Sequence, residues 1–229
     1  MKEYWEQTVQ ELEENLKTSR LGLSGEEALT KREKYGENVL SEGKKESVIS
    51  IFLHQFCDLL VVILIVAAGI SMFSGNIEST VVILLVLVMN AILGTVQHVK
   101  AQNSLDSLKQ LSSPSAKVIR DGKKIEIPSK DIVPGDLVLL EAGDLIVADG
   151  RIIHNYSLQV NESSLTGEST NVEKSDELLE GELSLGDRRN MVYSGSLVTY
   201  GRAEILVTST GMDTEIGRIA TMMNDVKER

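Results

Sequence analysis

The sequence predicts an α+β membrane protein, in which two long apolar helices separate a short helical region from a β-rich domain. Three observations support this fold class. Charge is concentrated toward the two ends of the chain, and short β-rich runs follow residue 114. Apolar segments of membrane-spanning length lie at residues 51–73 and 80–99, the second within a helix and stalk predicted over residues 79–112. A chain of 229 residues is long enough for one or two modest domains with a real core.

The N-terminal residues 1–48 are predicted to be helical. Apolar residues recur there at helical spacing and predict an amphipathic helix over residues 3–18, at Trp5, Val9, Leu12 and Leu16. A second helix is expected to begin at Ser24, because Glu27 three residues later completes a capping box, and Gly36 offers its end. Neither helix carries a chemical constellation, so both are interpreted as packing elements.

Two apolar segments in the middle of the chain predict a transmembrane hairpin. A helix needs roughly 20 apolar residues to cross the hydrocarbon core, and both segments reach that length. The link at residues 74–76, Ser-Gly-Asn, is a turn signal and is too short for a domain. The second helix is expected to continue as a stalk to residue 112, before Pro114 ends it.

Basic residues predict the orientation of this hairpin. Lys44 and Lys45 precede the first span and Lys100 follows the second, whereas the connecting loop has no Lys or Arg. The positive-inside rule then places both soluble parts in the cytoplasm, and the plasma membrane is the expected location. A buried hairpin in a soluble protein is the alternative, which the length of the two apolar runs disfavours.

Three polar residues, His54, Cys57 and Asp58, lie at the cytoplasmic end of the first span. They could line an ion path, or their side chains could extend to the membrane interface. Both interpretations stay open.

Residues 114–213 have the short strands and turn residues of a compact β-barrel or sandwich. Turns are expected at Asp121-Gly122, at Gly143-Asp144, at Asn155 and at Gly201. A last helix is predicted over residues 214–229.

Composition excludes several function classes. The chain has 34 acidic and 23 basic side chains, a net charge of −11, which argues against a nucleic-acid partner. Its single cysteine, Cys57, excludes a disulfide scaffold and a Cys-x-x-Cys metal or redox site.

The loop after Val160 contains the best candidate for chemistry. Thr166, Gly167, Glu168 and Ser169 place a carboxylate directly after a glycine, which permits positive φ and a close approach to a partner. A carboxylate in this setting can order and deprotonate a water molecule. Without any second catalytic group or phosphate-binding loop nearby, an ordinary β-connection is the simpler interpretation of the residues alone.

Several ordered motifs resemble those of P-type cation-transporting ATPases. Thr166-Gly167-Glu168-Ser169 is similar to the actuator-loop signature of that family. Five other blocks recur in the same order, at residues 133–136, 141–144, 148–151, 190–195 and 210–217. The resemblance covers nearly the whole chain and is closest to pumps of the calcium-transporting type, with sodium/potassium and proton pumps as the alternatives.

The resemblance implies a distorted jelly-roll-like actuator domain that rotates and pulls on the first membrane helices. It implies that Glu168 positions and activates the water that hydrolyses an aspartyl phosphate in another domain. Thr166 and Gly167 would shape the loop and Ser169 would support it. The transported cation would be Ca²⁺.

The family's phosphorylation motif, nucleotide-binding lysine motif and magnesium-binding aspartates are absent from this sequence. The resemblance therefore implies that Mg²⁺ and ATP bind to other domains of a complete pump and that this chain alone is inactive. Its partners would be the lipid bilayer, the phosphorylation and nucleotide-binding domains, and later membrane helices.

Small departures from the family pattern occur at Val147 and Asn171, where proline is common, and at His54 and Cys57, near the usual position of carboxylates in calcium pumps. Two alternatives stay open: a naturally short, non-enzymatic membrane regulator that docks on a pump, and an independent hydrolase that uses Glu168.

Overall fold

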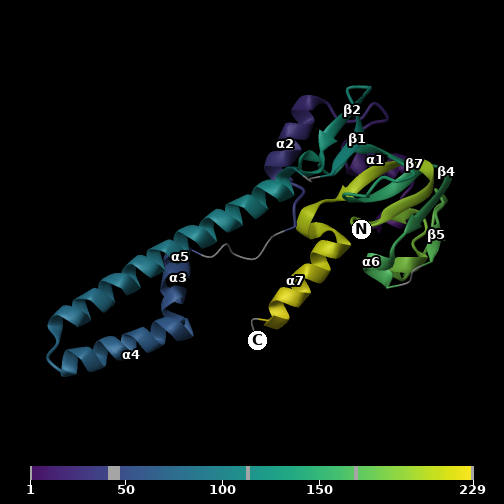
Figure 1. Cartoon of the computed structure of the whole chain (residues 1–229). Helices are drawn as coiled ribbons and strands as arrows, with labels where there is room; N and C mark the ends of the chain where they lie inside the picture. The colour runs from purple at the N-terminus through teal and green to yellow at the C-terminus, as the bar shows by residue number, and fades with distance from the viewer. Residues whose placement is uncertain (1, 41–46, 112–113, 168–169, 228–229) are drawn as a thin grey trace. The chain divides into compact units, whose positions relative to one another are not determined.

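The computed structural model describes residues 2–40, 47–111, 114–167 and 170–227. The chain forms two compact units, one made of residues 1–41 and 113–229 and the other of residues 42–112. Figure 1 shows the helices and the antiparallel sheet. The fold is therefore mixed helix and antiparallel sheet, as expected for an α+β chain.

The apolar unit contains the two predicted hydrophobic segments. Its helices are α3 (Val48–His54), η2 (Gln55–Cys57), α4 (Leu59–Phe73) and α5 (Ile77–Leu111). Within the described residues, α5 is the helix that is long and apolar enough by itself to cross a membrane, over Ile77–Leu105. Its extension to Leu111 agrees with the predicted stalk as far as the described residues reach.

The prediction of one continuous helix over residues 51–73 is wrong. Segments Val48–Cys57 and Leu59–Phe73 meet at a bend of 68°. Asp58 is the cause, because its backbone is extended and its side chain accepts a hydrogen bond from the Leu60 amide at 2.9 Å. An aspartate in this N-cap arrangement starts a new helix.

The N-terminal region contains η1 (Tyr4–Glu6), α1 (Val9–Asn15) and α2 (Gly25–Tyr35). The single helix predicted for residues 3–18 is wrong, since Thr8 and Glu11 form a capping box that starts α1 afresh. The capping box of Ser24 and the helix end at Gly36 are confirmed for α2.

Seven strands form one sheet in the order β2-β1-β3-β7-β4-β5, with β6 paired to β4, and every pair is antiparallel. The strands are β1 (Ser115–Arg120), β2 (Lys123–Pro128), β3 (Leu137–Glu141), β4 (Asp149–Asn161), β5 (Asn171–Glu173), β6 (Met191–Val192) and β7 (Leu197–Ser209). The short remaining elements are η3 (Ser129–Asp131), α6 (Ser163–Thr166), η4 (Leu185–Asp187) and η5 (Gly211–Asp213), and the last helix is α7 (Glu215–Lys227).

The Asp121-Gly122 turn is confirmed between β1 and β2, where both residues have positive φ. The turns predicted at Asn155 and Gly201 are wrong, because both residues lie inside 13-residue strands. The pairing of β4 with β7 contains register shifts near these positions. A Cβ on Gly201 would lie 2.2 Å from the Ser157 carbonyl oxygen, so glycine here permits a close bulge rather than a chain reversal.

The main core lies on one face of this sheet, and the N-terminal helix α1 packs on the other. The buried core residues include Val118, Val138, Leu140, Ile152, Leu158, Val160, Val198, Ile205 and Val207. On the opposite face, Leu12 of α1 packs with Leu137, Ile153 and Leu206. The segments before and after the apolar unit therefore contribute to one domain.

A buried ion pair holds the turn before β3. Arg120 donates two hydrogen bonds to the Asp136 carboxylate, from Nε at 2.8 Å and from a terminal nitrogen at 2.7 Å. The same carboxylate accepts from the Val133 amide at 2.9 Å, and Asp136 is fully buried. The bidentate pair and the amide together satisfy both carboxylate oxygens.

Asp149, the first residue of β4, joins the sheet to α7. Its carboxylate accepts hydrogen bonds from the Ser194 and Glu215 amides, both at 2.8 Å. Figure 1 shows α7, in yellow, leaving the sheet after β7. Burial raises the pKa of Asp149 to about 6, although the two amides partly oppose this effect.

We expect Asp136→Asn to lower the free energy of unfolding by about 3–5 kcal/mol, because it leaves the Arg120 charge without its partner. Urea unfolding of the full chain in detergent can be followed by the fluorescence of Trp5, the single tryptophan. The control Glu141→Gln removes the exposed pair with Lys117 and should leave the unfolding free energy nearly unchanged. Equal effects of the two changes would contradict this assignment.

Asp149 should make the free energy of unfolding depend on pH, and Asp149→Asn should remove its contribution to this dependence. Its folded-state pKa of about 6 exceeds the ordinary aspartate value of 3.8, so the stability from the protonated form is complete below about pH 4 and is lost as pH rises through 6. The unfolding free energy of the wild type relative to Asp149→Asn should therefore fall by up to about 3 kcal/mol between pH 4 and 7. A pH-independent difference in the same fluorescence assay would refute it.

Candidate functional site

Thr166 and Gly167, two of the four predicted site residues, lie at the end of the short helix α6, directly after β4. Both are exposed. Glu168 and Ser169, the other two, lie outside the described residues, so their roles stay predictions from sequence.

Backbone hydrogen bonds to one carbonyl build α6. The Glu162 carbonyl accepts from the amides of Leu165 at 2.9 Å and Thr166 at 3.0 Å, and from the Thr166 hydroxyl at 3.2 Å. Gly167 ends the helix in the left-handed conformation, with φ of 75°. A Cβ at Gly167 would have open space around it, so the backbone conformation and not crowding favours glycine here.

A second, buried charge pair lies beneath this turn. Glu162 follows β4 and Lys174 follows β5, and the Glu162 carboxylate contacts the Lys174 ammonium. The two side chains are 1% and 0% exposed. Burial raises the pKa of Glu162 and lowers the pKa of Lys174, because desolvation outweighs their mutual attraction.

Glu162 and Lys174 were not identified from the sequence. The available signal was a pair of opposite charges on the two sides of the Thr166–Ser169 segment. This signal is weak, because charges at such positions usually face solvent and only the tertiary structure shows that both are buried.

Hydrogen bonds connect α6 to the start of α7. The Ser164 hydroxyl donates to the Gly195 carbonyl at 3.1 Å, and the adjacent Ser194 amide donates to Asp149. Asp149 in turn accepts from Glu215, the first residue of α7. Three hydrogen bonds therefore link the candidate loop with the helix that leaves the domain.

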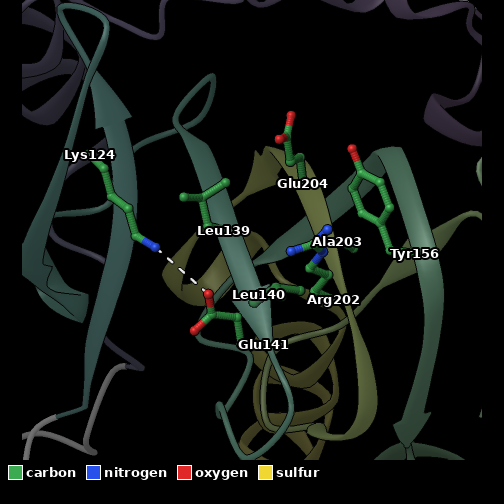
Figure 2. A pocket seen from close by; sticks show the side chains of 8 residues that line it. All are labelled: Lys124, Leu139, Leu140, Glu141, Tyr156, Arg202, Ala203 and Glu204. Atoms are coloured by element: carbon green, nitrogen blue, oxygen red, sulfur yellow. Dashed lines mark ion pairs between the residues drawn. The ribbon is translucent and has the colours of Figure 1, made fainter.

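A separate groove of about 300 Å³ lies on the sheet, where Lys124 of β2 faces Glu141 of β3 at 3.7 Å (Figure 2). Arg202 lies over the Tyr156 ring, 4.7 Å from its centroid, on the neighbouring strands. Neither Thr166 nor Gly167 lines this groove. The groove is therefore distinct from the candidate site.

The described residues limit the chemistry that this chain can perform. Among them, no group of three or more His, Cys, Asp or Glu side chains could hold a metal ion.

Two family models match this chain. The family model for the P-type ATPase actuator domain matches residues 110–224, and the model for the cation transporter/ATPase N-terminus matches residues 4–71.

Similar proteins include two calcium-transporting ATPases. The one from Lactococcus lactis is 46% identical over 98% of this chain, and the one from Listeria monocytogenes is 43% identical over 99% of it. A sodium/potassium exporting P-type ATPase of Saccharomyces cerevisiae is 41% identical over 93% of the chain. The matched regions cover 26% of each bacterial relative and 20% of the yeast relative, so the chain spans about a quarter of their length or less. The chain belongs to the P-type ATPase family, and its sheet and C-terminal helix correspond to the family's actuator domain.

Proposed function

We propose that this chain is the actuator and first membrane hairpin of an ATP-driven Ca²⁺ pump. The observation that carries this proposal is the exposed Thr166-Gly167 turn, which lies beside the buried ion pair of Glu162 and Lys174 in a domain that matches the actuator family. Phosphorylation and nucleotide-binding domains, with ATP and Mg²⁺, and later membrane helices would belong to the remainder of the pump.

The proposed chemical step is hydrolysis of an aspartyl phosphate carried by the phosphorylation domain. The Glu168 carboxylate accepts a proton from a water molecule as the water oxygen bonds to phosphorus. The bond between phosphorus and the aspartate oxygen breaks, which releases inorganic phosphate and a free aspartate carboxylate. A positioned base and an in-line water suffice, because an acyl phosphate is already a good electrophile. Thr166 and Gly167 shape the loop and Ser169 supports it.

The proposed membrane part is a two-helix hairpin with both soluble parts in the cytoplasm. Its apolar side chains support contact with lipid, since many are exposed on the unit, as at Leu59 (76%) and Phe73 (97%). The proposed parts are 1–48 for the N-terminal helical part, 51–73 for a first membrane segment that is bent at Asp58, and 79–112 for the second membrane helix and stalk. Residues 114–213 form the proposed jelly-roll-like core, and residues 214–229 the helix leading to the next span.

The choice of Ca²⁺ rests on the relatives that are named calcium-transporting ATPases. A relative named for sodium and potassium export is almost as similar, so ion-dependent phosphorylation must decide the cation. In the complete pump, Ca²⁺ should stimulate phosphoenzyme formation from ATP, whereas Na⁺ and K⁺ should not.

We expect Glu168→Gln in the complete pump to form phosphoenzyme and to slow its decay by roughly 10²–10⁴-fold, the usual effect of losing a general base. Pulse labelling with ATP followed by a chase measures the decay rate. Glu173→Gln, at an exposed carboxylate on β5, is the matched control and should decay like the wild type. Unchanged decay of Glu168→Gln would exclude the proposed role.

The hairpin can be tested by cysteine labelling in intact cells that express this 229-residue chain, in which Cys57→Ser removes the one cysteine of the sequence. A membrane-impermeant maleimide added outside should label Ser74→Cys in the connecting turn. It should label Ser19→Cys in the exposed N-terminal region only after the cells are opened. Labelling of both sites from outside, or of neither, would contradict the topology.

A further inference from the structure

The ion pair of Glu162 and Lys174 is deeply buried, although removing charged groups from water is costly. Both side chains are at most 1% exposed. Among the described residues, neither charged group has a hydrogen-bond partner outside the pair. The Lys174 ammonium also lies 5.7 Å from the centroid of the Tyr193 ring. Each charge therefore depends on the other for compensation.

The pair connects the two ends of the segment that carries the candidate loop. Glu162 supplies the carbonyl on which α6 is built, before Thr166. Lys174 lies after the loop, and its amide donates to the Leu158 carbonyl at 3.0 Å. We call residues 162–167, which lead into the loop, and residues 170–174, which lead out of it, the two arms of the loop. The ion pair thus joins Glu162, the first residue of one arm, to Lys174, the last residue of the other.

Strand pairing alone holds these two arms weakly. β5 has three residues, and it pairs with β4 only at Glu173, Val172 and Asn171. So short a ladder does little to prevent a shift in register, and a one-residue shift would turn each β5 side chain to the other face. A buried pair of opposite charges penalises such a shift, because separation leaves two uncompensated charges in the interior.

We propose that Glu162 and Lys174 are positioning residues for phosphoenzyme hydrolysis, whose ion pair holds the two arms of the Thr166–Ser169 loop in a single register. This proposal rests on the function proposed above for that loop. The pair does not touch the reacting atoms; it acts on the rate through the geometry of the loop.

The decisive measurement is the first-order decay of phosphoenzyme in the complete pump, since this rate constant does not depend on how much protein is correctly folded. Glu162→Gln and Lys174→Met should each slow decay by about 10–100-fold, the range expected from a displacement of about 1 Å. Lys174→Arg keeps the charge pair and should decay within about threefold of the wild type.

Two further comparisons separate positioning from general damage. The rate of phosphoenzyme formation from ATP should stay near the wild-type value in each variant. The double variant Glu162→Gln/Lys174→Met should decay no more slowly than the slower single variant, because both residues act through one contact. The control Lys117→Met removes an exposed ion pair with Glu141 and should leave decay unchanged.

Wild-type decay in both single variants, or fully multiplicative slowing in the double variant, would overturn the proposal. If neither neutral variant forms phosphoenzyme, Glu162→Asp is the deciding variant. It keeps the charge but withdraws it by one methylene, so decay should slow by about 3–10-fold, and wild-type decay would overturn the proposal.

Glu168→Gln in the same assay separates the proposed role of Glu168 from the positioning role of Glu162 and Lys174. If it slows decay while the Glu162 and Lys174 variants do not, the positioning role alone fails.

Discussion

Strands β4 and β7 pair along most of their 13 residues. The candidate loop and the last helix both follow the ends of these two strands. Asp149 lies at the start of β4, and α6 begins just beyond its end. α7 follows β7 after one short 3₁₀ turn, η5. The bulge at Ser157 and Gly201 adjusts the ladder without ending it. The candidate loop and the departing helix are therefore positioned by the same pair of strands.

Two buried ion pairs lie at junctions between segments of this domain. Arg120 with Asp136 holds the turn before β3, and Glu162 with Lys174 joins the two arms of the loop. Burying such groups is costly, and apolar residues of similar size often stabilise a fold more. Their value here is geometric, because each pair is satisfied in only one arrangement of its segments.

The apolar unit illustrates how a single polar residue changes a hydrophobic segment. Hydropathy alone predicts one helix across residues 51–73, but Asp58 can cap the helix that follows it and so permits a 68° bend. Farther along, Gly94 of α5 allows a close approach by Gln55, whose side-chain oxygen would lie 2.6 Å from a Cβ at that position. Packing within this unit therefore depends on small and polar residues within otherwise apolar helices.

The sequence by itself determined the features that depend on neighbouring residues. These include the apolar segments, the capping box at Ser24, the Asp121-Gly122 turn and the ordered motifs that indicate the family. Hydropathy, capping and turn preference act over a few residues, so a linear pattern reports them well. The chemical role of Glu168 is likewise a prediction from the sequence.

Only the tertiary structure decided which local signals prevail. It divided the helix predicted for residues 3–18, extended strands through Asn155 and Gly201, and buried Glu162 against Lys174. A turn residue becomes a bulge when a long partner strand pairs on both sides of it. A charged residue becomes an internal anchor when folding places its counter-charge beside it. Both outcomes depend on contacts between residues distant in sequence, which no local pattern contains.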